Sequence, residues 1–170
     1  MSVKFLLLLA EGKRDPAFAK LQFGIVIDQR LGMPFCFDEI SQEWLLAHVP
    51  MDKRLLRAWL QAGYWEEDQL YPTTAGTPQG GLISPLLANL ALDGMEQAVQ
   101  AVAQAGDKVH FVRYADDFVV TGTTRELLEQ KVKPALTAFL HQRGLELSEQ
   151  KTVVTPIQEG FHFLGHTLRK

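Results

Sequence analysis

Two adjacent carboxylates, Asp116 and Asp117, stand between two stretches rich in β-branched and aromatic residues. These stretches, residues 109–114 and 118–121, are typical of two strands joined by a tight connection. Neighbouring negative charges at a strand end repel each other unless a cation neutralises them, and carboxylate oxygens are ligands that Mg²⁺ prefers. The pair therefore indicates a magnesium site, although a solvated Asp-Asp turn is an alternative that the pair alone leaves open.

A glycine-rich loop, Gly-Thr-Pro-Gln-Gly-Gly at residues 76–81, precedes the carboxylate pair in the chain. Glycine lets one backbone approach another closely, and unpaired amide groups can donate to phosphate or sugar oxygens. The loop leads into a helix that Ser84 is expected to cap and Pro85 to begin. An ordinary turn into a helix is the alternative for the loop alone. The combination of the loop with the carboxylate pair is far more specific than either feature.

Capping residues locate the first elements that must position these groups. Ser41 is expected to cap a short helix, and Pro50 to open a second one over residues 51–62 that Gly63 closes. Strands are expected at residues 3–10 and 22–28, and a loop at residues 64–81.

Two longer helices are expected in the rest of the chain. The one that begins at Ser84 carries an apolar stripe and should run to Gly106. A capping box at residues 123–126 begins the other, which should bend at Pro134 and end at Gly144. The closing stretches, residues 151–156 and 161–168, are expected to pair as strands.

The order of these elements predicts an α+β domain. Strand, helices, strand, strand, helix, strand is a split βαββαβ (ferredoxin-like) layout, in which helices cover one face of an antiparallel sheet. With 170 residues the chain is long enough for one such domain with a real core. Many unrelated functions use this layout, so the residues and not the fold must decide the function.

The composition is typical of a cytoplasmic globular protein. The apolar run at residues 5–10 is too short to span a bilayer, so no membrane contact is expected. Cys36 has no second cysteine to pair with and is expected to be a small buried hydrophobe. Seventeen Lys and Arg against twenty Asp and Glu give a net charge of −3, whereas nucleic-acid-binding domains are usually basic. Either the basic surface lies in parts that this chain lacks, or the protein does not hold nucleic acid by itself.

The loop, the helix start and the carboxylate pair together resemble the reverse transcriptases encoded by group II introns. The matching stretches run from Cys36 to the C-terminus and occur in the family's order. The resemblance implies a polymerase palm domain, with an RNA template, a DNA primer and dNTPs as partners and Mg²⁺ as the cofactor. The stretches that carry it are residues 76–81, 84–89 and 114–117, with flanks at residues 37–41, 44–46, 147–152 and 160–165.

The resemblance also implies a role for each matching residue. In such sites two Mg²⁺ ions clamp the attacking primer 3′-hydroxyl and the leaving pyrophosphate. Asp116 matches the principal metal ligand and Asp117 its neighbour. Lys151 matches a lysine near the triphosphate that acts as a general acid, with a surface lysine as the alternative. The substrate-binding matches are Phe37, which crowds the ribose 2′-hydroxyl, Gln79, Gly80 and Gly81, which line the nascent base pair, and Tyr114 and Ala115, which pack against the primer end.

The chain departs from the family at the first catalytic aspartate, which the family carries six residues before the position of Asp38. Counting back from Asp38 reaches Gly32, which offers no ligand to a metal, so a loss of catalysis by orders of magnitude is expected. Asp28, at the end of the second strand, could supply the third metal ligand if the connection to Phe35 is a bulge or a loop. A turn residue that ends the strand is the alternative for Asp28.

The departure from the family pattern at Gly32 suggests that the chain consists of two regions. Residues 1–34 are expected to be a non-family segment that packs on the domain and replaces a strand of the sheet, and residues 35–170 to be the palm. The family's fingers and thumb are expected to be missing, which would account for the acidic net charge. Surfaces that these parts would cover should be exposed and partly apolar, and this favours a homo-oligomer.

Three other functions fit parts of the pattern. A palm remnant that binds RNA or a partner chain without polymerising would tolerate the loss of the first aspartate. An RNA-recognition module shares the βαββαβ layout, but it places stacking aromatic and basic residues where this chain has Asp116 and Asp117. A nucleotide cyclase with a palm-like fold would also need acidic ligands, but the loop and its flanks favour the polymerase family.

Overall fold

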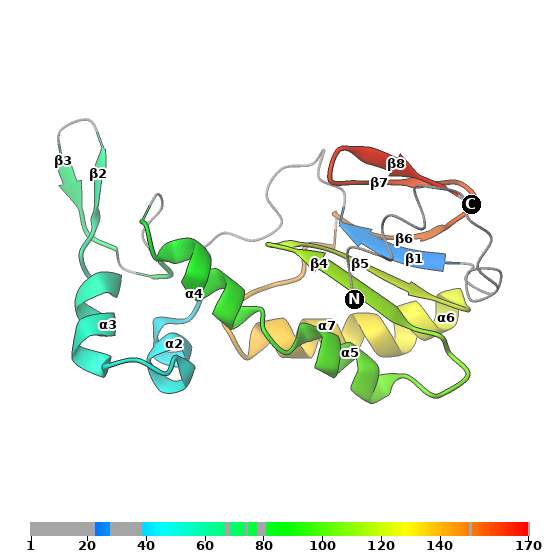
Figure 1. Ribbon diagram of the computed structural model, residues 1–170, viewed down its shortest axis with the longest axis horizontal. Coiled ribbons are helices and arrows are strands. Elements are labelled where there is room, and N and C mark those ends of the chain that lie inside the picture. The colour runs from blue at the N-terminus through cyan, green and yellow to red at the C-terminus, as the bar shows by residue number, and fades with distance from the viewer. Residues whose placement is uncertain are drawn as a thin grey trace.

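A four-stranded antiparallel sheet forms the centre of the computed structural model (Figure 1). The structure describes residues 23–27, 39–66, 69–73, 75–77, 81–149 and 151–169. The strands lie side by side in the order β4-β5-β1-β6, so the first strand along the chain is a central one. This is the order of a βαββαβ domain, and it confirms the predicted layout. The four strands are β1 (Phe23–Ile27), β4 (His110–Tyr114), β5 (Asp117–Gly122) and β6 (Thr152–Pro156).

The central strand β1 lies within the predicted range of residues 22–28. Its sequence Phe-Gly-Ile-Val-Ile is rich in β-branched residues, and the side chain of Ile25 is fully buried. Antiparallel pairing aligns Val26 with Val119 of β5 and Ile27 with Thr152 of β6. The end of β1 therefore lies at the same end of the sheet as the starts of β5 and β6. The strand predicted at residues 3–10 and the other residues before β1 lie outside the described residues, as does Cys36, which follows β1.

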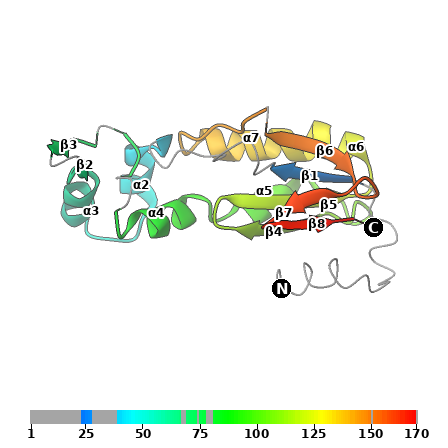
Figure 2. The same ribbon diagram turned by 90° about the horizontal axis from the view of Figure 1, so that it is seen from above.

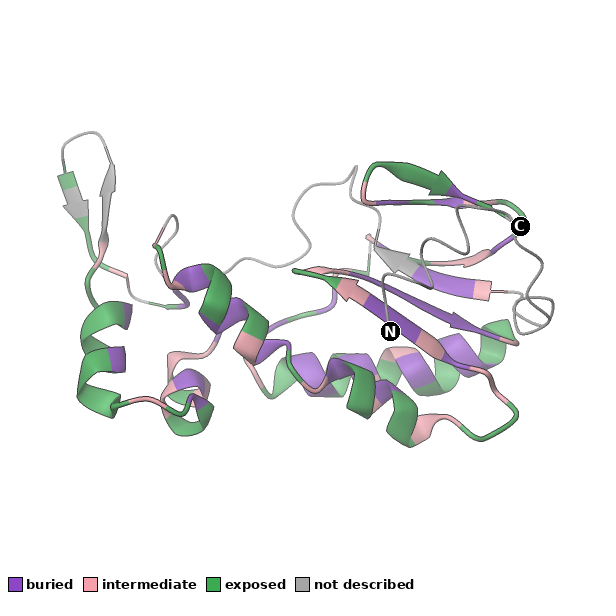
Figure 3. Ribbon diagram, in the orientation of Figure 1, coloured by how far each residue is buried: buried purple, intermediate pink, exposed green. Residues whose placement is uncertain are grey.

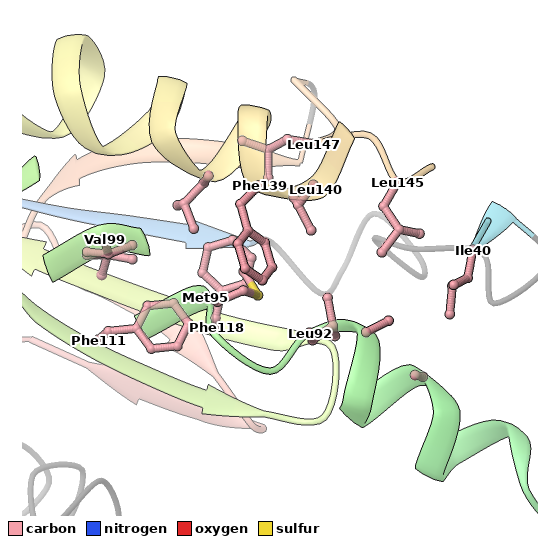
Figure 4. Packing of buried hydrophobic residues seen from close by; sticks show 14 of the residues in the cluster. Ile40, Leu92, Met95, Val99, Phe111, Phe118, Phe139, Leu140, Leu145 and Leu147 are labelled. Atoms are coloured by element: carbon pink, nitrogen blue, oxygen red, sulfur yellow. The ribbon is translucent and has the colours of Figure 1, made fainter. Parts of the chain in front are cut away.

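Helices cover one face of the sheet, and a small hairpin covers part of the other (Figures 1 and 2). Successive residues of a strand point to opposite faces. Phe118 and Val120 belong to the large core beneath the helices, whereas Val112 and Val119 pack with Phe163 of the hairpin. Figure 4 shows Met95, Phe118 and Phe139 among the side chains that fill the space between the helices and the sheet.

The first long helix differs from the prediction, because it is broken into α4 (Ser84–Ala91) and α5 (Met95–Val102). Gly94, with a φ of 92°, lies between the two helices. The helical backbone is interrupted there, but the apolar stripe continues from α4 into α5. A Cβ at this position would lie 3.3 Å from the ring of Phe139, so the glycine also allows close packing. Ser84 is the first helical residue and is buried, and the cap is Ile83 without a side-chain hydrogen bond. The prediction that Ser84 is the cap is wrong.

The second long helix begins and ends where the sequence predicted but contains a wide turn. It consists of α6 (Arg125–Leu127), a π-helical segment η4 (Leu128–Val132) and α7 (Lys133–His141). Its cap is Thr124, whose hydroxyl accepts from the Leu127 amide at 3.2 Å. The capping box predicted at residues 123–126 is therefore wrong, because the cap lies one residue later and Leu127 stands where a box needs Glu or Gln. The π segment ends at Val132, two residues before Pro134, and its widened turn can accommodate the amide that proline lacks.

Residues 41–62 form a separate helical end of the molecule (Figures 1 and 2). Ser41 caps α2 (Gln42–His48) through the Trp44 amide at 3.1 Å, as predicted. Helix α3 (Lys53–Leu60) is capped by Asp52 and not opened by Pro50, because the Asp52 carboxylate accepts from two amides of the first turn. The loop predicted at residues 64–81 instead contains a hairpin of β2 (Tyr64–Glu66) and β3 (Gln69–Tyr71).

The C-terminal strands pair differently from the prediction. Strand β6 pairs with β1, and residues 161–168 form their own hairpin of β7 (Phe161–Phe163) and β8 (His166–Leu168). Leu164 and Gly165 have φ values of 49° and 76°, and two positive φ angles are the geometry of a two-residue hairpin turn. The turn of this hairpin therefore lies at residues 164–165, whereas a separate turn at residues 157–160 joins β6 to β7.

Burial is concentrated between the sheet and helices α4 to α7, while most of α3 is exposed (Figure 3). Arg143, just beyond α7, ties three helices to this core. Its Nε donates to the Ala91 carbonyl of α4 at 2.6 Å, and its guanidinium lies 4.7 Å from the ring centroid of Trp44 in α2. Of the helices that the structure describes, none is both long and apolar enough to cross a bilayer.

Candidate active site

The two carboxylates lie at a tight turn between β4 and β5. Tyr114 pairs with Asp117 across the turn, which leaves only Ala115 and Asp116 between the strands. Ala115 has a φ of 53°, a left-handed conformation that is unusual for a residue other than glycine. Asp116 and Asp117 are both partly exposed. The predicted strands and their connection are confirmed, and they present the two carboxylates at one end of the sheet.

The donor set of this turn fits a divalent cation. Asp116 and Asp117 offer hard carboxylate oxygens, and Mg²⁺ commonly takes one or two carboxylates and completes its shell with water and substrate phosphate. Among the residues that the structure describes, no cluster of three or more His, Cys, Asp or Glu could hold a metal ion. The described part of the turn thus offers two acidic side chains. Asp28 and Gly32, the two positions that bear on the third ligand, lie outside the residues that the structure describes.

Lys151 lies at the same end of the sheet as the turn. It directly precedes β6, and the Ser148 carbonyl accepts from the backbone amides of Lys151 and Thr152 at 3.3 and 3.0 Å. Strand β1 separates β6 from β5. Because neighbouring strands lie about 4.8 Å apart, the starts of β5 and β6 are roughly 10 Å apart. The fold therefore brings Lys151 to the edge that carries Asp117, although 34 residues separate them in the chain.

The glycine-rich loop is held at both ends. Gln42 of α2 donates to the Gly76 carbonyl at 3.0 Å, and the Ser84 amide donates to the Gly81 carbonyl at 3.2 Å. Thr77 is buried. Of the substrate-binding positions inferred from the sequence, Gly81, Tyr114 and Ala115 are described, and Phe37, Gln79 and Gly80 lie outside the described residues.

Large apolar side chains at the end of β4 and around the start of α4 face solvent. Tyr114 is 66% exposed, and Leu82 and Leu86 are 104% and 55% exposed. Leu82 precedes α4, which begins at Ser84, and Leu86 lies in the first turn of that helix. The hydrogen bond from Arg113 to Asn89 connects the same helix to the carboxylate turn.

Arg113, which the sequence analysis did not single out, contacts the turn directly. Its Nη1 donates to the Ala115 carbonyl at 2.7 Å and to the Asn89 Oδ1 of α4 at 2.9 Å. Burial lowers the pKa of this guanidinium, and the charge of Asp93 opposes the shift. A basic residue directly before the strand end was the only signal in the sequence, and it does not identify a partner 24 residues away.

Comparisons with known proteins agree with this geometry. The family model of reverse transcriptase (RNA-dependent DNA polymerase) matches residues 29–168. The chain is 27% identical to the group II intron-encoded protein LtrA of Lactococcus lactis subsp. cremoris, over 79% of this chain and 33% of that protein. It is 31% identical to protein YkfC of Escherichia coli (strain K12), over 67% of this chain and 38% of that protein. The chain thus spans about a third of the length of the curated relatives that it matches.

Solved structures show the same fold in more distant proteins. A structure of apo telomerase from Candida tropicalis, truncated from the C-terminal domain, superposes with a TM-score of 0.65 at 18% identity, over 95% of this chain and 36% of that one. A telomerase from Candida albicans, in complex with a TWJ fragment of telomeric RNA, gives a TM-score of 0.61, also at 18% identity. The sheet with its helices is therefore a polymerase palm. Reverse transcriptases generally use divalent metal ions and bind an RNA template, which agrees with carboxylates placed at the sheet's end. The family match over most of the chain, the intron-encoded relatives and the palm fold together show that this chain belongs to the reverse transcriptase (RNA-dependent DNA polymerase) family, in its group II intron-encoded branch.

Proposed function

We propose that this chain is the catalytic palm of an RNA-directed DNA polymerase that extends a DNA primer along an RNA template. The observation that carries the proposal is the placement of Asp116, Asp117 and Lys151 at one end of the palm sheet. In the reaction, the primer 3′-hydroxyl loses its proton to solvent and its oxygen forms a bond to the α-phosphorus of a dNTP, while the bond from that phosphorus to the pyrophosphate oxygen breaks. Asp116 and Asp117 would hold Mg²⁺, which when bound stabilises the negative charge on the reacting oxygens.

The remaining residues would place the substrates and move one proton. Lys151 would donate a proton to the leaving pyrophosphate, as a general acid at the edge of the site. Tyr114 and Ala115 would pack against the primer end, and the exposure of the Tyr114 ring leaves it available for that contact. Phe37 would exclude the 2′-hydroxyl of a ribonucleotide, and Gln79, Gly80 and Gly81 would line the new base pair.

The third carboxylate is proposed to come from Asp28. The chain reaches this residue directly after Ile27, which ends β1 between the starts of β5 and β6. A carboxylate in that position would lie next to Asp117 if the antiparallel register of β1 and β5 continued by two residues. We propose further that the domain boundary lies near residue 34, with the segment before it contributing β1 to the palm sheet.

A catalytically inactive palm that binds RNA is the second candidate. Gly32 stands where the family has the first aspartate, and this favours the inactive palm. The residues that the structure describes offer two acidic side chains at the turn and no larger cluster. The two candidates differ in their need for metal. A polymerase requires Mg²⁺ for extension, whereas an RNA-binding remnant would bind RNA equally well in EDTA.

Primer extension with the purified chain, Mg²⁺, an RNA template and a DNA primer tests the proposal. Extension should be lost in Asp116→Ala and reduced by at least tenfold in Asp28→Asn. Glu146→Ala, which removes an exposed carboxylate after α7, is the matched control and should extend normally. Folded protein that extends no primer, and that binds RNA equally with and without EDTA, would favour the inactive palm. Extension that survives Asp28→Asn would contradict the proposed third ligand.

A further inference from the structure

One side-chain bridge links the carboxylate turn to the helix that follows the glycine-rich loop. Arg113 Nη1 donates two hydrogen bonds, to the Ala115 carbonyl at 2.7 Å and to Asn89 Oδ1 at 2.9 Å. A guanidinium nitrogen carries two hydrogens, so both bonds can form at once. The bridge therefore connects strand β4, its turn and helix α4 through a single atom.

The turn needs such support because of its backbone. Ala115 has a φ of 53°, a conformation that side-chain-bearing residues disfavour. A charged donor on the Ala115 carbonyl makes a strong hydrogen bond in that conformation. Asp116 follows Ala115 directly, so the position of its carboxylate depends on the orientation of the peptide that this carbonyl belongs to.

The other end of the bridge fixes the distance to the substrate loop. Asn89 lies on α4, and the first turn of α4 is bonded to the loop through the Ser84 amide and the Gly81 carbonyl. Partial burial of the guanidinium lowers the pKa of Arg113, and the nearby charge of Asp93, at the break between α4 and α5, opposes this shift.

We propose that Arg113 and Asn89 are positioning residues, which hold the Asp116 turn at a fixed place relative to helix α4 and the loop before it. The assignment rests on the proposed metal site, because the purpose of the fixed turn is to present Asp116 to a divalent cation. Neither residue touches the reacting atoms in this assignment. Their effect on the site passes through the Ala115 carbonyl.

Two measurements on the full chain test the bridge. The first is amide hydrogen exchange at residues 115–117 in metal-free protein. The second is Mn²⁺ affinity, measured by paramagnetic broadening of the same amide signals. Asn89→Ala is the decisive variant, since Asn89 is exposed on α4, so its loss should not prevent folding. It should speed exchange at the turn and weaken Mn²⁺ binding by roughly tenfold, the usual effect of an outer-shell residue.

Companion variants separate positioning from a general loss of stability. Arg113→Ala should match Asn89→Ala, and the double variant should be no worse than Arg113→Ala, because both residues act through one bridge. Asn89→Asp, which keeps the acceptor oxygen, should restore both measurements toward wild type. Arg125→Ala removes an exposed arginine whose partner is Glu129, at 2.8 Å, and should change neither.

The opposite results would overturn the inference. Wild-type exchange at the turn in folded Asn89→Ala protein would do so, as would losses that multiply in the double variant or an equal loss in Arg125→Ala. Failure of the proposed metal site would be recognised separately. In that case the Asp116→Ala substitution would not remove any Mn²⁺ broadening that the wild-type protein shows. Hydrogen exchange, which needs no metal, would in that case decide on the bridge alone.

Discussion

Residues without reactive groups determine the shape of the Asp116 turn. The positive φ of Ala115 costs a non-glycine residue roughly 1–2 kcal/mol, and the bond from Arg113 to its carbonyl offsets part of that cost. The sequence identified Asp116 and Asp117, because paired carboxylates at a strand end are unusual on their own. It did not identify Arg113 and Asn89, because their roles exist only through a contact between residues 24 positions apart.

His110, at the start of β4, should make the stability of the fold depend on pH. Burial, and to a lesser extent the positive charge of Lys108, lowers the pKa of His110 below its ordinary value of 6.5. The unfolded chain therefore binds this proton more readily than the folded protein does. Stability is expected to fall as the pH drops below about 6.5, until the lowered pKa of the folded state is passed.

Urea unfolding of wild type and His110→Gln at pH 7.5 and pH 5.5 measures this contribution. The loss of stability on acidification should be smaller in His110→Gln than in wild type. Lys108→Gln should reduce the loss only in part, because Lys108 is the lesser cause of the shift. An identical loss in all three proteins would show that other groups, such as paired carboxylates, cause the acid dependence.

Predictions that depend on neighbouring residues agree with the structure better than predictions that depend on contacts between distant parts of the chain. Short-range capping and turn chemistry predicts the helix cap at Ser41, the strands around the carboxylates and the helix stop at Gly144. The structure has all three features. The break at Gly94 was missed because the apolar stripe continues across it, and the glycine is needed for contact with Phe139 on another helix. The pairing of β6 with β1 was also missed, because strand pairing depends on the whole sheet and not on neighbouring residues.

Arg143 should be the strongest single connection between the helices. It donates to the carbonyls of Ala91 and Phe139 at 2.6 and 2.7 Å, and its guanidinium stacks on the Phe139 ring at 3.4 Å. Ala91 is the last residue of α4, so the bond satisfies a helix carbonyl that has no partner within its own helix. Arg143→Ala should lower the free energy of unfolding by about 2–3 kcal/mol, since it removes charged hydrogen bonds and ring contacts.

Chemical denaturation of two arginine variants checks this prediction. Arg125→Ala is the control, because Arg125 makes an exposed pair with Glu129 four residues along the same helix. Its loss should cost no more than about 0.5 kcal/mol. Equal effects of the two substitutions would mean that the contacts of Arg143 add nothing beyond an ordinary surface ion pair.

The molecule as a whole combines a well-packed palm with large apolar side chains that face solvent at the start of α4. Leu82, just before α4, and Leu86, in its first turn, are 104% and 55% exposed. The net charge of −3 gives little repulsion between copies of the chain. Exposed apolar residues in one place favour association, so the chain is expected to form oligomers through this surface as its concentration rises.

Sedimentation velocity across a range of concentrations tests this assembly, with two double variants of matched size. Leu82→Ser with Leu86→Ser should shift the chain toward the monomer, because it removes the apolar contact that association would bury. Leu55→Ser with Trp59→Ser changes the exposed face of a different helix, α3, and it should leave the association unchanged. A wild-type chain that stays monomeric at high concentration would contradict the prediction. Dissociation by the α3 variant alone would instead place the contact on the exposed face of α3 and not at the start of α4.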